Sequence, residues 1–166
     1  MKGNFVPETF QVPVSLEATD YRLEVLRPEV TRLDYDAVMS SKTRLRSVFS
    51  EATEWPRDDM TLEKNTDDLA RHEREFEARE AFAYTVLSPA GDKCVGCVYV
   101  CPPRVVGFDS EVYLWVRDDC VHLDEHLYLT VRNWLVEAWP LKRTAFPGRE
   151  ISWAQWATFL EDPAES

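Results

Sequence analysis

The sequence predicts one α/β domain over residues 1–166, in which a mixed β-sheet carries helices on both faces. Three observations support this fold class. A strand at residues 111–116 leads directly into a long amphipathic helix, and two further apolar strands, at 82–87 and 93–101, flank a turn-forming segment. The 166 residues, 45% of them hydrophobic, are enough for one packed core. No internal repeat or linker divides them.

The expected elements follow from local pattern and turn chemistry. In order, we expect an extended lead-in over 1–20, a strand over 21–26, a helix over 34–49, a loop over 50–60, a helix over 61–80, strands over 82–87, 93–101 and 111–116, an acidic turn over 117–119, a helix up to 139, a strand over 142–146, a short helix from 152 and a flexible tail over 162–166. Asp34, Thr61 and Ser152 are the expected helix N-caps, because short polar side chains satisfy the free N–H groups of a first turn.

The strand and helix within residues 110–139 organise the prediction. Apolar residues recur on one face of the helix at Leu123, Leu127, Val131, Trp134, Leu135 and Ala138. The strand alternates between two faces, both of them in use. A strand that feeds directly into a helix places free N–H groups at its carboxyl end, where α/β folds often bind an anionic ligand.

Composition excludes several classes of function. The net charge of −11, with no basic cluster, argues against a surface for nucleic acid or an anionic membrane, whereas a cationic partner would fit. No apolar run reaches transmembrane length, and the first residues lack the pattern of a signal peptide. The expected location is therefore the cytoplasm.

Four cysteines are present, at positions 94, 97, 101 and 120. The pair Cys94-Val-Gly-Cys97 has the spacing of a redox or zinc pair, but it lies in a predicted strand, where the two thiols would face opposite sides unless Gly96 makes a bulge. The competing interpretation is that these cysteines are small core residues.

The order β-α-α-β-β-β-α-β-α resembles the Gcn5-related N-acetyltransferase (GNAT) family. The resemblance is carried by Tyr84-Thr-Val-Leu87, Gly91-Asp92, residues 95–100 and Glu111-Val-Tyr-Leu-Trp-Val116. It covers residues 20–147 and implies a mixed central sheet whose C-terminal strands are shortened or missing here. It also implies acetyl-CoA as co-substrate, bound between the fourth and fifth strands.

The resemblance further assigns roles to individual residues. It implies that the backbone of the fourth strand pairs with the pantetheine arm, that the turn after it holds the pyrophosphate, and that Glu111 deprotonates the acceptor amine. The implied cofactor-binding residues are Tyr113, Leu114, Trp115, Val116, Arg117, Asp119, Cys120, Val121 and His122. Trp115 is also the tryptophan that we expect in the cleft.

The sequence departs from the family at the pyrophosphate loop, which reads Arg/Gln-x-x-Gly-x-Gly/Ala in the family. The matching positions here are Val121, Asp124 and His126, so the basic residue and both glycines are missing. Several carboxylates lie around the same helix end. A non-catalytic module that has lost coenzyme A binding is therefore the leading alternative to an N-acetyltransferase.

A third hypothesis rests on His122-Leu-Asp-Glu-His126, which matches the H-x-x-E-H pattern of zinc peptidases. Two histidines four residues apart on a helix share a face and can bind one metal, with Glu125 polarising a bound water. Cys120 lies nearby as a further possible ligand. Against a zinc hydrolase, such peptidases have a larger fold with a third carboxylate ligand far downstream, and a match of three fixed positions arises easily by chance.

The favoured function from sequence is transfer of an acetyl or other acyl group from acyl-CoA to an amine. The expected acceptor is a small-molecule or peptide amine, with neither nucleic acid nor membrane as a partner. The oligomeric state stays open, although a sheet that lacks its last strands would leave an unpaired edge where a homodimer could form.

Overall fold

The computed structural model describes residues 5–161 and contains one six-stranded sheet. The strands lie in sequence order, and all neighbours are antiparallel except the last pair, β5 and β6, which is parallel. Their bounds are β1 (Ser15–Glu17), β2 (Arg22–Val25), β3 (Phe82–Leu87), β4 (Cys94–Cys101), β5 (Ser110–Val116) and β6 (Thr144–Ala145). The mixed sheet predicted from the sequence is thus confirmed.

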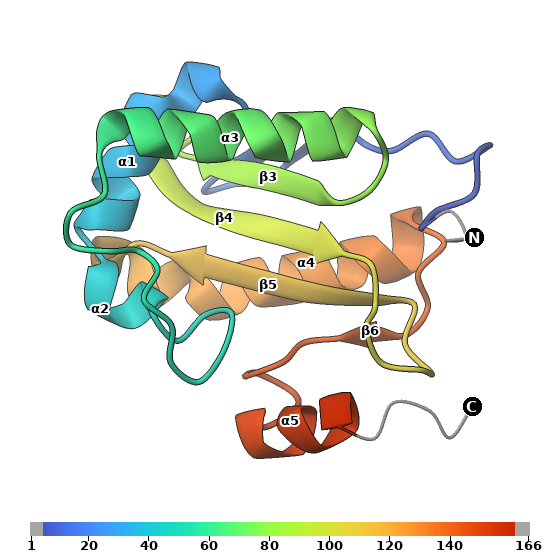
Figure 1. The fold of residues 1–166 in the computed structure, drawn as a ribbon. Coiled ribbons are helices and arrows are strands. Elements are labelled where there is room, and N and C mark those ends of the chain that lie inside the picture. The colour runs from blue at the N-terminus through green and yellow to red at the C-terminus, as the bar shows by residue number, and fades with distance from the viewer. Residues whose placement is uncertain (1–4, 162–166) are drawn as a thin grey trace.

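Helices cover both faces of this sheet (Figure 1). Their bounds are α1 (Thr31–Met39), α2 (Lys42–Leu45), α3 (Leu62–Glu77), α4 (Asp124–Ala138) and α5 (Trp153–Glu161), with short 3₁₀ helices η1 (Pro28–Val30) and η2 (Asp118–Leu123). Helices α1 and α3 lie on one face and α4 on the other (Figure 1). No helix of residues 5–161 is long and apolar enough to cross a membrane.

The alternation along β5 explains why the sheet has two cores. Val112, Leu114 and Val116 belong to the core that α4 covers. Tyr113 and Trp115 belong to the core under α1 and α3. Since successive side chains of a strand point to opposite faces, both sets of β5 residues can be buried.

Two N-terminal predictions need correction. The lead-in includes a short strand, β1, because residues 15–17 pair with β2. The single helix expected over 34–49 is divided into α1 and α2, with the backbone of Ser41 non-helical between them. Asp34 is not an N-cap but a buried residue inside α1, where its carboxylate meets Asn65 and Cys97 instead of free backbone N–H groups.

The other caps and the C-terminal half largely match expectation. Thr61 accepts a hydrogen bond from the backbone N–H of Lys64, and Ser152 accepts one from that of Gln155, so both predicted caps are confirmed. The strand expected over 142–146 is reduced to β6, which is one of the two edge strands of the sheet. The predicted tail, 162–166, lies outside the described residues.

Candidate ligand-binding cleft and cavity

The free edge of β5 is where the fold opens. Arg117 N–H donates to the carbonyl of Val95, so the odd-numbered residues of β5 direct their backbone groups toward β4. The backbone groups of Val112, Leu114 and Val116 therefore face the opposite side. Strand β6 pairs only with the first two residues of β5, Ser110 and Glu111, so beyond that point this edge has no strand partner within residues 5–161.

Two arginines bind the carbonyl oxygens of this edge. Arg149, in the turn after β6, donates from Nη2 to the Leu114 oxygen at 3.3 Å. Arg44, in α2, donates from Nη1 to the Val116 oxygen at 2.9 Å. A ligand arm that paired with β5 through these carbonyls would have to displace both guanidinium groups.

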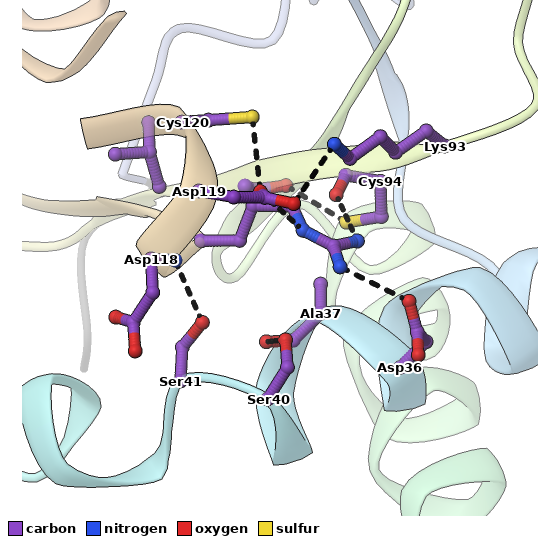
Figure 2. A network of polar contacts seen from close by, with 12 residues as sticks. Asp36, Ala37, Ser40, Ser41, Lys93, Cys94, Asp118, Asp119 and Cys120 are labelled. Carbon is purple, nitrogen blue, oxygen red and sulfur yellow. Dashed lines mark hydrogen bonds and ion pairs between the residues drawn. The ribbon is translucent and has the colours of Figure 1, made fainter. Parts of the chain in front are cut away.

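A polar network that includes Asp36, Asp118 and Asp119 holds the turn between β5 and α4 (Figure 2). The side chain at its centre is that of Arg117. This side chain is largely buried, and it donates to the Cys94 carbonyl at 3.3 Å and to the Asp36 carboxylate at 3.1 Å. Its Nε also lies 2.8 Å from a carboxylate oxygen of Asp119. Asp118 N–H donates to the Ser41 hydroxyl at 2.9 Å. Arg117 therefore ties the turn to α1 and β4.

Each remaining cation near this turn is paired with a carboxylate. Arg44 contacts Asp118 at 3.0 Å, and Lys93 contacts Asp119 at 3.1 Å. The contact with Lys93 holds the pKa of Asp119 below its usual range, against a small desolvation effect. These carboxylates occupy the helix start where the anion of a ligand would otherwise bind.

The residues present do not fit an acyl-CoA molecule as they are arranged. The hollow between β5 and the turn after β6, lined by Leu114, Arg149 and Trp153, holds about 170 Å³, below the roughly 300 Å³ at which ligand pockets begin. The Leu114 and Val116 carbonyls already accept hydrogen bonds. The turn expected to hold a pyrophosphate carries carboxylates that pair with the nearby cations Arg44 and Lys93.

A larger cavity of about 600 Å³ lies on the other side of β5, under α3. We call it the α3 cavity. Its wall includes the aromatic side chains Phe49, Trp55, His72, Phe82, Tyr99 and Tyr113, the carboxylates Asp34, Asp68, Glu75 and Glu111, and the cations Lys64, Arg71 and Arg104. Both Lys64 and Arg104 pair with carboxylates of the same wall.

Glu111 lies in this wall rather than facing solvent, with only 3% of its surface exposed. One carboxylate oxygen accepts a hydrogen bond from Arg104 Nε at 2.6 Å, while the other, Oε2, is buried with no hydrogen-bond partner among the described residues. Desolvation raises the pKa of Glu111, and Arg104 opposes that effect. A buried, half-satisfied carboxylate is suited to accept a hydrogen bond from a ligand.

The aromatic side chains surround the space next to Glu111. Phe49 contacts Trp55, Tyr99 and Tyr113 with ring centroids 5.0–5.5 Å apart. His72 lies against Tyr99, and burial, followed by the nearby Arg71, lowers its pKa to about 4. His72 is therefore neutral at pH 7 and presents an aromatic surface to the cavity.

Only some of the cofactor-binding residues expected from the sequence lie beside the hollow at the β5 edge. Tyr113 and Leu114 border the small hollow beside β5, and Val116 lies at the same edge. Trp115 points away from it, into the core under α1 and α3, where its Nε1 donates to the Tyr99 hydroxyl, so the prediction of Trp115 in the cleft is wrong.

The remaining turn residues are also dispersed. Cys120 is buried and donates from Sγ to Asp119, whereas Val121 and His122 are exposed. His122, Glu125 and His126, the ligands of the zinc hypothesis, do not bring three ligand atoms together within residues 5–161. His126 instead contacts the Tyr21 hydroxyl at 2.8 Å.

Sequence reasoning missed the arginines that define this region, Arg44, Arg104 and Arg149. Each acts on a partner in another element, so no local spacing marks it. The sequence places Phe49 at the end of an expected helix and Trp55 in an expected loop. It does not reveal their role, because Phe49 packs against Trp55 and, at long range, against Tyr99 of β4 and Tyr113 of β5.

Comparisons with known proteins show the fold. No protein-family model matches the sequence, and no curated protein matches it either. A ribosomal-protein-S5-alanine acetyltransferase from Vibrio fischeri superposes with a TM-score of 0.63 at 16% identity, over 90% of this chain and 81% of the other. A ribosomal L7/L12 α-N-protein acetyltransferase in complex with coenzyme A gives 0.56 at 12% identity, over 74% of this chain and 66% of the other.

These likenesses confirm the GNAT-like fold predicted from the sequence. The solved structures that share it are acetyltransferases, which include enzymes of ribosomal proteins. The chain spans slightly less than two thirds of the second structure's length. At these identities, the likeness extends to the fold and not to the activity.

Proposed function

We propose that this chain is a GNAT-fold binding module that holds a protonated amine in the α3 cavity and does not transfer an acyl group. The observation that carries the proposal is the binding of the Leu114 and Val116 carbonyls by Arg149 and Arg44. In this arrangement side chains of the same chain already bind the β5 carbonyls with which a coenzyme A arm would pair. The α3 cavity, which does not depend on these carbonyls, can still bind a ligand.

The wall of the α3 cavity supports an amine as the ligand. Glu111 Oε2 offers a buried acceptor that has no hydrogen-bond partner within residues 5–161. A charged ammonium group is the donor that gains most from such an acceptor. The rings of Phe49, Tyr99 and Tyr113 lie close together in the same wall, and aromatic faces attract cations. A peptide N-terminus or a primary alkylamine has the matching charge.

Transfer of an acyl group to that amine is the second candidate, as the sequence favoured. Its support is the position of Glu111, buried at the start of β5 beside the cavity, where burial raises its pKa toward that of a general base. The acetyltransferase activity of the proteins with the same fold also favours it.

Calorimetry separates the two candidates. A short peptide with a free N-terminus is titrated into the protein without coenzyme A, with its N-acetylated form as the matched control. We expect the free amine to bind at least tenfold more tightly, and acetyl-CoA to give neither heat nor a thermal shift at millimolar concentration. Micromolar binding of acetyl-CoA that weakens on Lys93→Ala would overturn the proposal in favour of acyl transfer.

A further inference from the structure

A bulge in β4 brings together two cysteines that a regular strand would separate. Strand β3 pairs Val86 with Gly96 and Leu87 with Cys94, so Val95 is an extra residue on β4. A separation of three residues would place the two thiols on opposite faces of a regular strand, and one inserted residue restores them to the same face. Cys94 and Cys97 accordingly both lie in the core under α1 and α3.

Asp34, from α1, completes a cluster of three ligand-bearing side chains. Its carboxylate oxygen and the two sulfur atoms all lie within 4.8 Å of one another. Cys97 Sγ is 3.4 Å from Asp34 Oδ1. Both cysteines are fully buried, and Asp34 is 3% exposed. A carboxylate in an apolar core is costly unless it is hydrogen-bonded or binds a metal. Cys97 and Asn65 donate to Asp34 here, and Cys94 donates to the Gly96 carbonyl at 3.4 Å.

We propose that Asp34, Cys94 and Cys97 bind a zinc ion. Thiolates and a carboxylate are ligands that Zn²⁺ accepts, at roughly 2.3 Å for sulfur and 2.0–2.2 Å for oxygen. Around a tetrahedral ion, those bond lengths put a sulfur and an oxygen ligand about 3.5 Å apart and two sulfurs about 3.8 Å apart. The observed contact between Cys97 and Asp34 already has this spacing.

The surroundings of the cluster are consistent with a metal site. Asn65 Nδ2 donates to Asp34 Oδ2 at 2.9 Å, which orients the carboxylate and leaves Oδ1 directed at the sulfur atoms. The Arg117 guanidinium donates to the backbone carbonyl of Cys94 and brings positive charge near the thiolates. Asp34 and Asn65 also line the α3 cavity, whereas Cys94 and Cys97 do not, so the cluster lies directly behind the cavity wall.

Zinc binding releases protons from the ligands. Cys94 and Cys97 bind as thiolates, so both S–H protons leave to solvent, and Asp34 releases a third proton in those molecules in which its carboxyl group is protonated. The two thiolates and the carboxylate, with Zn²⁺, leave one net negative charge, which lies near Arg117. No oxidant or reductant takes part.

The test is metal binding by the full chain, purified without a histidine tag and kept reduced. Elemental analysis is expected to give one zinc per chain. After chelation, titration with Co²⁺ is expected to produce the near-ultraviolet absorption of thiolate–cobalt bonds, and Zn²⁺ should abolish it. Cys97→Ser is expected to remove this absorption and to weaken zinc binding at least tenfold, whereas Cys101→Ser, outside the cluster, should leave both unchanged.

Asp34→Asn, a near-isosteric change, provides an independent measurement if the Cys97→Ser variant does not fold. It is expected to fold, by circular dichroism, and to bind zinc at least tenfold more weakly. Absence of the thiolate–cobalt absorption from the wild-type chain would overturn the proposal, as would an equal affinity for zinc in the wild type and in Cys97→Ser. None of these readouts depends on an amine or on coenzyme A, so the zinc site and the proposed function can fail separately.

Discussion

Arg149 bridges the edge of β5 and the start of α4. Its Nη2 donates to the carbonyl oxygen of Leu114 at 3.3 Å, and its two terminal nitrogens bind both carboxylate oxygens of Asp124 at 2.7 and 2.8 Å. The resemblance noted in the sequence matches Asp124 to a glycine of the GNAT pyrophosphate loop. In this structure Asp124 is the anchor for the arginine at the neighbouring edge.

Arg149→Ala is expected to lower the free energy of unfolding by about 1–2 kcal/mol, because it breaks a bidentate, charge-assisted contact whose two side chains are each 28% exposed. Urea unfolding measures the change. Arg132→Ala is the matched control: its contact with Glu150 is 3.7 Å long and more exposed, and we expect a change below about 0.5 kcal/mol. Equal losses in the two variants would contradict the role given to Arg149.

The double variant Arg44→Ala/Arg149→Ala uncovers both carbonyls, and we expect that it still does not bind acetyl-CoA. The carboxylates of Asp118, Asp119 and Asp124 remain at the helix start, and two compensating cations are gone. Calorimetry at millimolar acetyl-CoA measures the outcome. Micromolar binding by this variant, with none by the wild type, would show that the arginines gate a working cofactor site.

The sequence was sufficient for the parts of the fold that depend on local pattern. Alternation along residues 111–116 and helical periodicity after them gave β5 and α4, because burial of one face leaves a regular trace. The prediction of Asp34 as a helix N-cap was wrong, although aspartate is a common N-cap residue. Its actual partners, Asn65 and Cys97, come from α3 and β4, which no local pattern reveals. The arginines at the β5 edge had no local signal either.

The bulge at Val95 was predicted only in part. The sequence indicated that Cys94 and Cys97 could share a face only through a bulge, and placed it at Gly96. The extra residue is Val95, and Gly96 has a different role. A Cβ on Gly96 would lie 1.9 Å from the Trp115 carbonyl oxygen, so glycine permits the close approach of β5.

Gly96→Ala is therefore expected to destabilise the protein by about 3 kcal/mol, the upper range for overpacking, since backbone atoms must move to admit the methyl group. Gly107→Ala is the comparison. Its φ of +97° makes alanine strained, but the nearest atom to the new Cβ is a side-chain nitrogen of Arg143 at 3.7 Å, and we expect a loss of about 1 kcal/mol. Thermal or urea unfolding should give the larger loss for Gly96; the reverse order would show that β4 and β5 are farther apart.

His72 predicts an acid-dependent loss of stability. Its pKa is about 4 in the folded chain, against 6.5 for the free side chain. Between these values the unfolded chain takes up a proton that the folded chain does not, so stability present above pH 6.5 is lost as the pH falls to 4. The effect is at most about 3 kcal/mol. Unfolding of the wild type and of His72→Gln across this window measures it, because the two chains carry the same carboxylates and differ only in this side chain; parallel pH profiles would contradict a buried, neutral His72.

Glu111→Gln tests the amine-binding role of the α3 cavity. The change keeps the shape of the side chain but removes the charge that Oε2 presents, so we expect binding of a free-amine peptide to weaken about tenfold. Wild-type binding should also fall as the pH is lowered through the pKa of Glu111, which burial raises, and the variant should lack that dependence. Glu77→Gln, at the exposed end of α3 and outside the cavity wall, is the control and should bind as the wild type does. Unchanged affinity and an unchanged pH profile in Glu111→Gln would place the amine elsewhere, because a cavity that bound it through Glu111 could not be indifferent to the loss of that charge.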